Sequence, residues 1–245
     1  MRRLLVLLAA CSSPSQTTPD APPSTDGAAD AAIDSPSGVP LSGFGDLGGM
    51  CGVLDVASLT GPTPMLFRDT LTFPRAYVDP DDRALLTPGG VHLAETPNAG
   101  GSSGLSEIFA YEELARCELA TLLKTETEIV YDTAGKITDL EVMVDGHKIG
   151  VSVTRAVAFP FGSPYTLSTA TTLITRKLQD IQASSMNVSA GDKWDKQILA
   201  ILAWDDQAAD VMAQAWMMAD AATKADTQVI ITVTGGDDTF IYSNN

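Results

Sequence analysis

One carboxylate stands at an unusual place in the sequence, inside the apolar stripe of a predicted helix. Leucine, isoleucine and phenylalanine recur at helical spacing over residues 104–124, which predicts that helix. Glu112 falls in the middle of the stripe, and Arg116 follows one turn later on the same face. A buried carboxylate needs a partner, and a Glu–Arg pair at i,i+4 supplies one. Two interpretations remain open: an internal ion pair that fixes the helix against a sheet, or a functional carboxylate.

Thiol chemistry is the second possibility that the sequence offers. Cys51 and Cys117 both lie in the part of the chain that is expected to fold. In an oxidising compartment two such thiols often pair. The bridge would close a loop of about 66 residues and stabilise the fold by roughly 4 kcal/mol in the chain-entropy model. Two separate buried thiols are the alternative, because the sequence does not fix the distance between the two Cα atoms.

The N-terminus has the composition of an export signal. In residues 1–10, Arg2 and Arg3 precede a short apolar run, Leu4–Leu8. The run Leu8–Cys11 resembles the lipobox of bacterial lipoproteins, a family in which the cysteine is acylated and becomes the first residue of the mature chain. The resemblance implies lipidation of Cys11. It also implies sorting to the outer membrane of a bacterial cell envelope, because Ser12 follows the cysteine.

Composition predicts an unfolded tether after the signal. Residues 11–45 are mostly Ser, Pro, Thr, Ala, Asp and Gly, so they cannot bury enough apolar surface to fold. No run of about 20 apolar residues occurs in the chain, which argues against a membrane-spanning helix. The formal net charge is −16, which makes nucleic acid an unlikely partner because such a field repels phosphate backbones. An acidic surface also keeps an exported protein soluble.

The remaining residues divide into a loop-rich part, 46–103, and an α/β core, 104–245. Turn residues dominate the first part, with short strands or helical turns near Leu66 and Val91. In the core, periodicity and turn signals predict eight elements and a possible edge strand. The elements are a helix at 104–124, strands at 128–131, 137–144 and 149–155, a helix at 168–183, a strand at 197–204, a helix at 206–224, a strand at 227–234 and the edge strand at 240–242.

This order, α-β-β-β-α-β-α-β with a hairpin between the second and third strands, resembles the core of the PD-(D/E)xK nuclease (restriction-endonuclease-like) superfamily over residues 104–204. The resemblance implies a mixed sheet with helices on its faces. In that family an Asp on the second strand and a Glu-x-Lys on the third converge on Mg²⁺, often with a helical Glu. Asp139 matches the Asp and Glu112 the helical Glu. Ser152 and Thr154 stand where the family has Glu and Lys.

The resemblance therefore implies a catalytically inactive nuclease-like domain that needs no cofactor. We expect it to contact the membrane through its lipid anchor and to bind an unknown protein or envelope component. A metal-dependent nuclease or phosphodiesterase that uses Asp139, Glu112 and Glu141 with Mg²⁺ is the enzymatic alternative. A structural lipoprotein of the envelope is the third interpretation.

Overall fold

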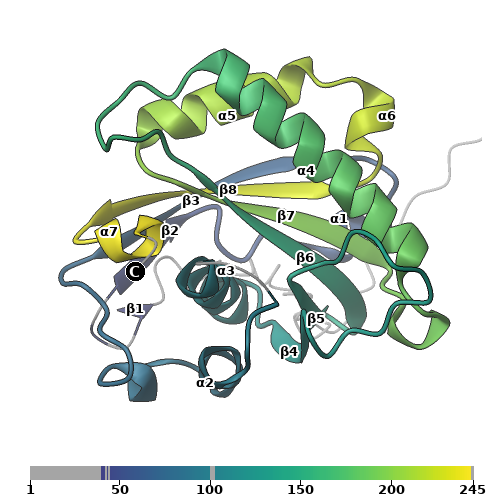
Figure 1. Ribbon diagram of the computed structural model, residues 1–245, viewed down its shortest axis with the longest axis horizontal. Helices are drawn as coiled ribbons and strands as arrows, with labels where there is room; N and C mark the ends of the chain where they lie inside the picture. Colours follow the sequence, from purple (N-terminus) through teal and green to yellow (C-terminus); the bar gives the residue numbers. More distant parts are fainter. Residues whose placement is uncertain (1–39, 42, 44, 100–102, 244–245) are drawn as a thin grey trace, which may run out of the picture. The chain divides into compact units, whose positions relative to one another are not determined.

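In the part of the chain that the computed structural model describes, residues 40–41, 43, 45–99 and 103–243, eight strands form one mixed sheet. Their order across the sheet is β1-β2-β3-β8-β7-β6-β5-β4 (Figure 1). The four central strands, from β3 to β6 in that order, run parallel, and the strands at both edges are antiparallel. The strands are β1 Pro40–Leu41, β2 Gly45–Gly49, β3 Leu66–Phe73, β4 Thr121–Thr125, β5 Leu140–Val144, β6 His147–Ala156, β7 Lys196–Ala203 and β8 Gln228–Gly236.

Helices cover both faces of the sheet, so the domain has three layers (Figure 1). Two long helices, α4 and α5, lie on one face, while α3 and α2 lie on the other. The helices are α1 Val56–Thr60, α2 Pro88–Glu95, α3 Gly104–Cys117, α4 Leu167–Asn187, α5 Asp206–Met218, α6 Ala221–Lys224 and α7 Thr239–Tyr242, with 3₁₀ turns η1 Arg83–Leu85 and η2 Ala190–Asp192.

The central strands are apolar on both sides because both sides are covered. Every residue of β7 is buried. Its Ile198 and Ala200 pack towards Leu114 of α3, whereas Leu199 and Ile201 belong to the cluster beneath α4 and α5. Burial on two faces explains why the sequence of this strand reads as a continuous apolar run.

The predicted α/β class and the order of elements in the core are confirmed. From residue 104 the chain runs α3, β4, β5, β6, α4, β7, α5 and β8, apart from the short helix α6. The hairpin between β5 and β6 turns at Asp145 and Gly146, which both have positive φ angles (47° and 81°). That pair of conformations is the tight turn that an Asp-Gly sequence favours.

The first predicted helix is too long, and the first predicted strand is misplaced. The helix ends at Cys117, and the chain turns through Leu119 at a positive φ of 53°. Residues 121–125 then form β4, which was predicted as helix, while residues 128–131 contribute one isolated bridge from Tyr131 to Val188. A short apolar run fits either element, so periodicity alone could not place the boundary.

Two C-terminal boundaries also differ from the prediction. The helix expected over 206–224 breaks after Met218, and Asp220 starts α6 by accepting a hydrogen bond from the backbone of Thr223 at 2.8 Å. The edge strand expected at 240–242 is the helical turn α7. The sheet offers it no place there, because β8 is already paired on both sides, and Tyr242 is fully buried instead.

The segments before residue 104 contribute more to the sheet than expected. The predicted tether, 11–45, overlaps β1 and the start of β2, and Leu41 is fully buried. The loop-rich part, 46–103, contains β3, whose eight residues pair in parallel with β8. Cys11 and residues 1–10 lie outside the described residues. Among the described residues, no helix is long and apolar enough to cross a membrane.

Cys51 and Cys117 form a disulfide, with Cα atoms 4.8 Å apart. This is one of the two arrangements that the sequence left open. The side chain of Glu118 binds beside it and accepts hydrogen bonds from the backbone N–H groups of Gly52 (2.8 Å), Val53 (3.2 Å) and Leu54 (3.0 Å). The C-terminal end of α3 is thereby attached twice to the turn that follows β2.

Candidate functional site

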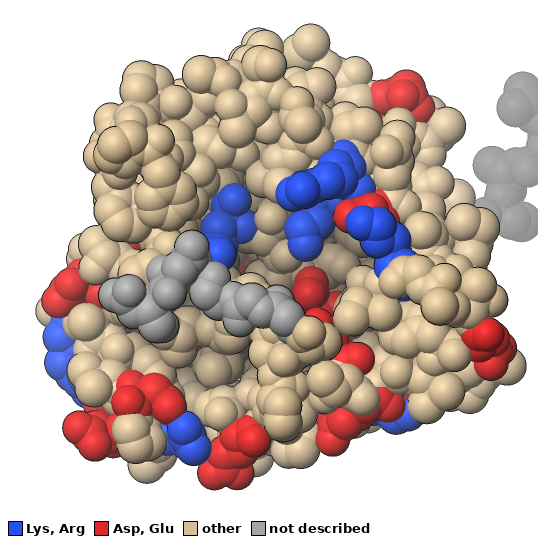
Figure 2. Space-filling view, viewed as in Figure 1, with Lys and Arg blue, Asp and Glu red and all other residues tan. Residues whose placement is uncertain are grey.

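A cavity of about 330 Å³ opens beside the N-terminal end of α3. Figure 2 shows a hollow on this side of the molecule, with Lys and Arg side chains gathered above it and Asp and Glu side chains below. Both apolar and acidic groups line the cavity, among them Leu93, Leu105, Asn98, Glu107, Thr125 and Glu126. Buried acidic groups in a cavity mark a candidate functional site, because their desolvation costs free energy that folding alone does not require.

Glu107, in the first turn of α3, is the acidic group at the base of the cavity. Its carboxylate is 5% exposed and accepts hydrogen bonds from Asn98 Nδ2 (2.9 and 3.1 Å) and Ser103 Oγ (2.6 Å). Burial, and after it the negative charge of Asp139, raises the pKa of Glu107 to about 7. The side chain is therefore close to half protonated at neutral pH.

Asp139 lies where β6 runs on beyond the end of its neighbour β5. The last pair of the two strands is Leu140 with Val151, so the following β6 backbone groups have no strand partner on this side. The Asp139 carboxylate accepts the Val153 N–H at 2.6 Å, and Lys177 Nζ of α4 donates to the Val153 carbonyl at 2.8 Å. Burial raises the pKa of Asp139, and the charge of Lys177 opposes the rise.

A further carboxylate, Glu126, follows β4 directly. It accepts a hydrogen bond from the backbone N–H of Ala99. Burial raises its pKa, and the charge of Asp139 acts in the same direction. Glu107 of α3, Glu126 after β4 and Asp139 before β5 come from three separate parts of the chain. Glu107 and Glu126 line the cavity, and the charge of Asp139 raises the pKa of both, with Lys177 as the cation beside Asp139.

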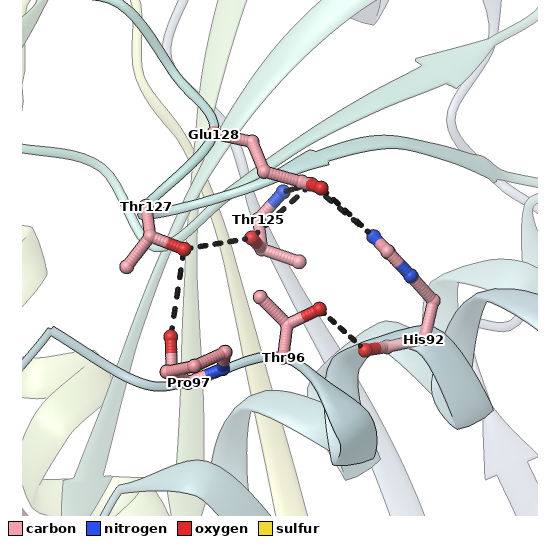
Figure 3. A network of polar contacts seen from close by, with 6 residues as sticks. All are labelled: His92, Thr96, Pro97, Thr125, Thr127 and Glu128. Carbon is pink, nitrogen blue, oxygen red and sulfur yellow. Dashed lines mark hydrogen bonds and ion pairs between the residues drawn. The ribbon is translucent and has the colours of Figure 1, made fainter.

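A network of polar contacts holds one wall of the cavity in place (Figure 3). Glu128 accepts hydrogen bonds from the backbone N–H and the hydroxyl of Thr125 (2.9 and 3.2 Å) and lies 3.1 Å from His92 Nε2 of α2. Thr127 donates to the carbonyl of Pro97 at 3.5 Å. The network fixes the turn after β4 against the segment after α2, so both Glu126 and Asn98 are presented by restrained backbone.

The carboxylates of the hollow can supply oxygen ligands to a divalent cation. Among the described residues, no three His, Cys, Asp or Glu side chains come together as a metal-binding group. A closed protein cage is therefore not formed by this part of the chain. Glu107 and Asp139 fit a more open kind of site, since Mg²⁺ is commonly held by one or two carboxylates while water and substrate phosphates complete its shell.

Glu112 does not belong to this site, contrary to the functional interpretation of the sequence. It is fully buried, and it accepts hydrogen bonds from Thr87 N (2.8 Å) and Oγ1 (2.6 Å) and from Arg116 Nε (3.0 Å). Arg116 Nη2 lies 2.9 Å away. The structure therefore contains the internal ion pair, which lies within α3. Glu112 attaches α3 to the start of α2 and not, as expected, to the sheet.

The other predicted positions lie around Asp139 without joining it. Ser152 is buried and Thr154 half-buried on β6, on the face opposite Val151 and Val153, which pack towards α3. Glu141 is buried on β5 and forms an ion pair with Lys148 at 3.0 Å. The expected group of Asp139, Glu112 and Glu141 is thus not assembled.

Glu107, Glu126 and Lys177 are the residues of the site that the sequence did not single out. Glu107 lies about one and a half turns before Glu112 on the same helix. The sequence pattern identified only Glu112, because Glu112 lies within the predicted apolar stripe. The signal in the sequence was positional: Glu107 lies in the first turn of α3, and Lys177 precedes the buried Leu178 of α4.

Comparisons with known proteins give few matches. No model of a protein family matches the chain. The AAC-rich mRNA clone AAC4 protein of Dictyostelium discoideum is 38% identical over 153 residues, which make up 60% of this chain and 22% of that protein. The chain thus spans about a fifth of the length of this relative.

This comparison corrects the expectation of a bacterial lipoprotein. The relative comes from a eukaryote, which has no bacterial outer membrane. The prediction of a bacterial lipoprotein is therefore contradicted by this relative, whereas the lipidation of Cys11 and the location of the protein stay predictions.

A solved structure of SfsA from Pyrococcus furiosus, in complex with Ca²⁺, is similar to the chain with a TM-score of 0.29 and 11% sequence identity. The match covers 54% of this chain and 55% of that one. At this TM-score the likeness supports no argument about family or activity.

Proposed function

We propose that the domain binds phosphodiesters in the hollow and hydrolyses them with the help of a divalent metal ion held by Glu107 and Asp139. One observation carries the proposal. After burial, the charge of Asp139, the residue directly before β5, contributes to the rise in the pKa of Glu107 on α3 to about 7. A cation between such groups removes the cost of burying them.

The donor set suits a hard cation, because Mg²⁺ prefers carboxylate oxygens and keeps several water molecules. When bound, such an ion polarises the phosphoryl oxygen and lowers the pKa of a water ligand. Glu107 and Asp139 are already positioned by hydrogen bonds from Ser103 and Val153, so little side-chain freedom is lost when they bind.

Lys177 is the positive group of the proposed site. Its hydrogen bond to the Val153 carbonyl places the ammonium beside Asp139 and at the free edge of β6. There it can bind a phosphate oxygen and stabilise negative charge that develops during attack by water. Thr154, which stands where the family pattern has a lysine, carries no charge. In the proposed site the positive charge comes instead from Lys177 of α4.

The rival function is binding without catalysis, which we expected from the sequence. Ser152 and Thr154 favour it, because hydroxyl groups are weaker metal ligands than a carboxylate and carry no ammonium. The net charge of −16 also opposes association with long nucleic acids. Both functions use the same hollow, and they differ in whether bound phosphodiester is cleaved.

The test is cleavage of bis(4-nitrophenyl) phosphate and of short oligonucleotides by the purified protein, with and without Mg²⁺ or Mn²⁺. We expect cleavage that requires the metal and falls on the order of 100-fold or more in Asp139→Asn and in Glu107→Gln. Glu95→Gln is the matched control, because Glu95 is an exposed carboxylate outside the hollow. Binding of oligonucleotide without cleavage under any metal would establish the non-catalytic alternative instead.

A further inference from the structure

A second cavity, of about 490 Å³, lies beside the N-terminal half of α4. Its lining includes two guanidinium groups, hydroxyl groups and apolar side chains, among them Arg155, Arg176, Ser168, Tyr165, Val157 and Leu173, and no Asp or Glu lines it in the part of the chain described. A pocket that combines basic and hydroxyl groups without any carboxylate has the chemistry of an anion site.

One of the two arginines of this cavity, Arg176, differs from several other arginines in the described part of the chain. Arg68, Arg75 and Arg83, for example, each form ion pairs with aspartates. Arg176, by contrast, is exposed and forms no ion pair with a described residue. Arg155 is half-buried and donates from Nη1 to the Ile241 carbonyl at 3.1 Å, which holds the guanidinium in place.

The electrostatic field in this cavity favours anions, although the protein as a whole is acidic. The cavity adjoins the start of α4, where the positive end of a 21-residue helix adds to the two guanidinium groups. Guanidinium groups bind phosphate with two parallel hydrogen bonds, a geometry that an ammonium cannot match. An oxyanion such as a phosphate group therefore fits the cavity better than a neutral ligand does.

The cavity also neighbours the proposed reaction site. Lys177, beside Asp139, directly follows Arg176 on α4, and Figure 2 shows Lys and Arg side chains gathered along the upper side of the same hollow. Arg155 lies two residues beyond Val153, to which both Asp139 and Lys177 are hydrogen-bonded. The two sites therefore share one stretch of β6.

We infer that the Arg155–Arg176 cavity binds the phosphate group next to the one that occupies the hollow, so that the ligand is a short single-stranded oligonucleotide with at least two phosphates. The inference rests on the proposed function for the phosphate in the hollow. A single strand suits the protein better than a duplex, because fewer phosphates then face the acidic surface around the site.

The experiment measures binding of two dithymidine ligands, one with and one without a 5′-phosphate, to the full chain carrying Asp139→Asn. The ligands differ by one phosphate, and the substitution prevents turnover. At low salt we expect the phosphorylated ligand to bind about tenfold more tightly, as one charge-assisted contact allows. Arg176→Gln should abolish that preference and Arg176→Lys should keep part of it.

Lys193→Gln is the matched control, because it removes one exposed positive charge elsewhere. It should leave the preference for the 5′-phosphate intact. An equal loss of preference in Lys193→Gln and Arg176→Gln would overturn the inference, since the effect would then come from overall charge. A preference that survives Arg176→Gln, or no preference at all, would overturn it as well.

The outcomes also separate this inference from the proposed function. If the protein prefers the 5′-phosphate through Arg176 but never cleaves phosphodiesters, the phosphate site in the Arg155–Arg176 cavity is supported and the proposed hydrolysis is rejected. If the protein cleaves phosphodiesters with a metal but shows no such preference, the proposed hydrolysis is supported and phosphate binding in the Arg155–Arg176 cavity is rejected.

Discussion

Two glutamates of α3, five positions apart, have opposite electrostatic surroundings. Glu112 is held by an arginine and by donors from the start of α2, so its charge is compensated. Glu107 receives neutral donors and faces the charge of Asp139, and its pKa rises to about 7. Five helical positions correspond to a rotation of about 140°, which points the two side chains at different neighbours. Glu112 stabilises the fold, whereas ionised Glu107 opposes it.

We predict that Glu107→Gln stabilises the protein at alkaline pH and not at acid pH. The pKa of Glu107 is about 7 in the folded protein against an ordinary value of 4.5, so folding favours its protonated form. That contribution is complete below about pH 4.5 and is lost as the pH rises through 7. At pH 8 the variant should gain up to roughly 3 kcal/mol in free energy of unfolding, measured by urea titration. Equal gains at pH 4.5 and pH 8 would contradict this account.

At the scale of single elements, α3 is attached to several other parts of the fold. Besides its contacts with the hollow and with α2, it carries Glu113, whose carboxylate accepts the Thr232 hydroxyl of β8 at 2.7 Å. Burial raises the pKa of Glu113 well above its usual range, and Asp69 of β3 acts in the same direction. Burial thus favours the protonated form of Glu113, which links the helix to the middle of the sheet.

The disulfide is expected to be the strongest single attachment of α3. It closes a loop between positions 66 residues apart, and chain entropy predicts a stabilisation of roughly 4 kcal/mol for a loop of that length. Replacing both cysteines by serine should lower the free energy of unfolding by about that amount in urea. Dithiothreitol should destabilise the wild-type protein to the same level and leave the variant unchanged. A loss below about 1 kcal/mol would mean that the hydrogen bonds of Glu118 hold this end of α3 without the bridge.

At the scale of the whole domain, the sheet is completed by strands from before and after α3. The parallel strand β3, from the segment 46–103, is the partner of β8 on the side opposite β7. The segment 104–245, which the sequence predicted as the core, therefore contains the buried strand β8 but not its neighbour β3. It also lacks Cys51, the partner of Cys117.

We therefore expect a fragment of residues 104–245 not to fold, because the apolar residues and backbone groups of β8 would be exposed along one edge. A fragment of residues 34–245, which includes every strand of the sheet, should unfold cooperatively on heating. Far-ultraviolet circular dichroism during a thermal scan distinguishes the two. A cooperative transition in the shorter fragment would show that β3 is an addition to an independent core.

Local patterns in the sequence determined the types and order of the core elements. The alternation in β6, the continuous apolar run of β7 and the Asp-Gly turn each depend on neighbours within a few positions, so they are readable without the fold. The C-terminal end of α3 could not be predicted from local patterns, since Leu122 and its neighbours suit a helix and a strand equally well. Likewise β3 reads as an isolated run among turns until its pairing with β8 is known.

Only the tertiary structure decided which charged residues meet. Asp139 was visible as a strand residue, but its neighbours Glu107, Glu126 and Lys177 come from α3, the end of β4 and α4. Their meeting depends on how each helix is rotated and on where β6 outruns β5. These are properties of long-range packing, and a periodic pattern in one segment contains no information about the orientation of another.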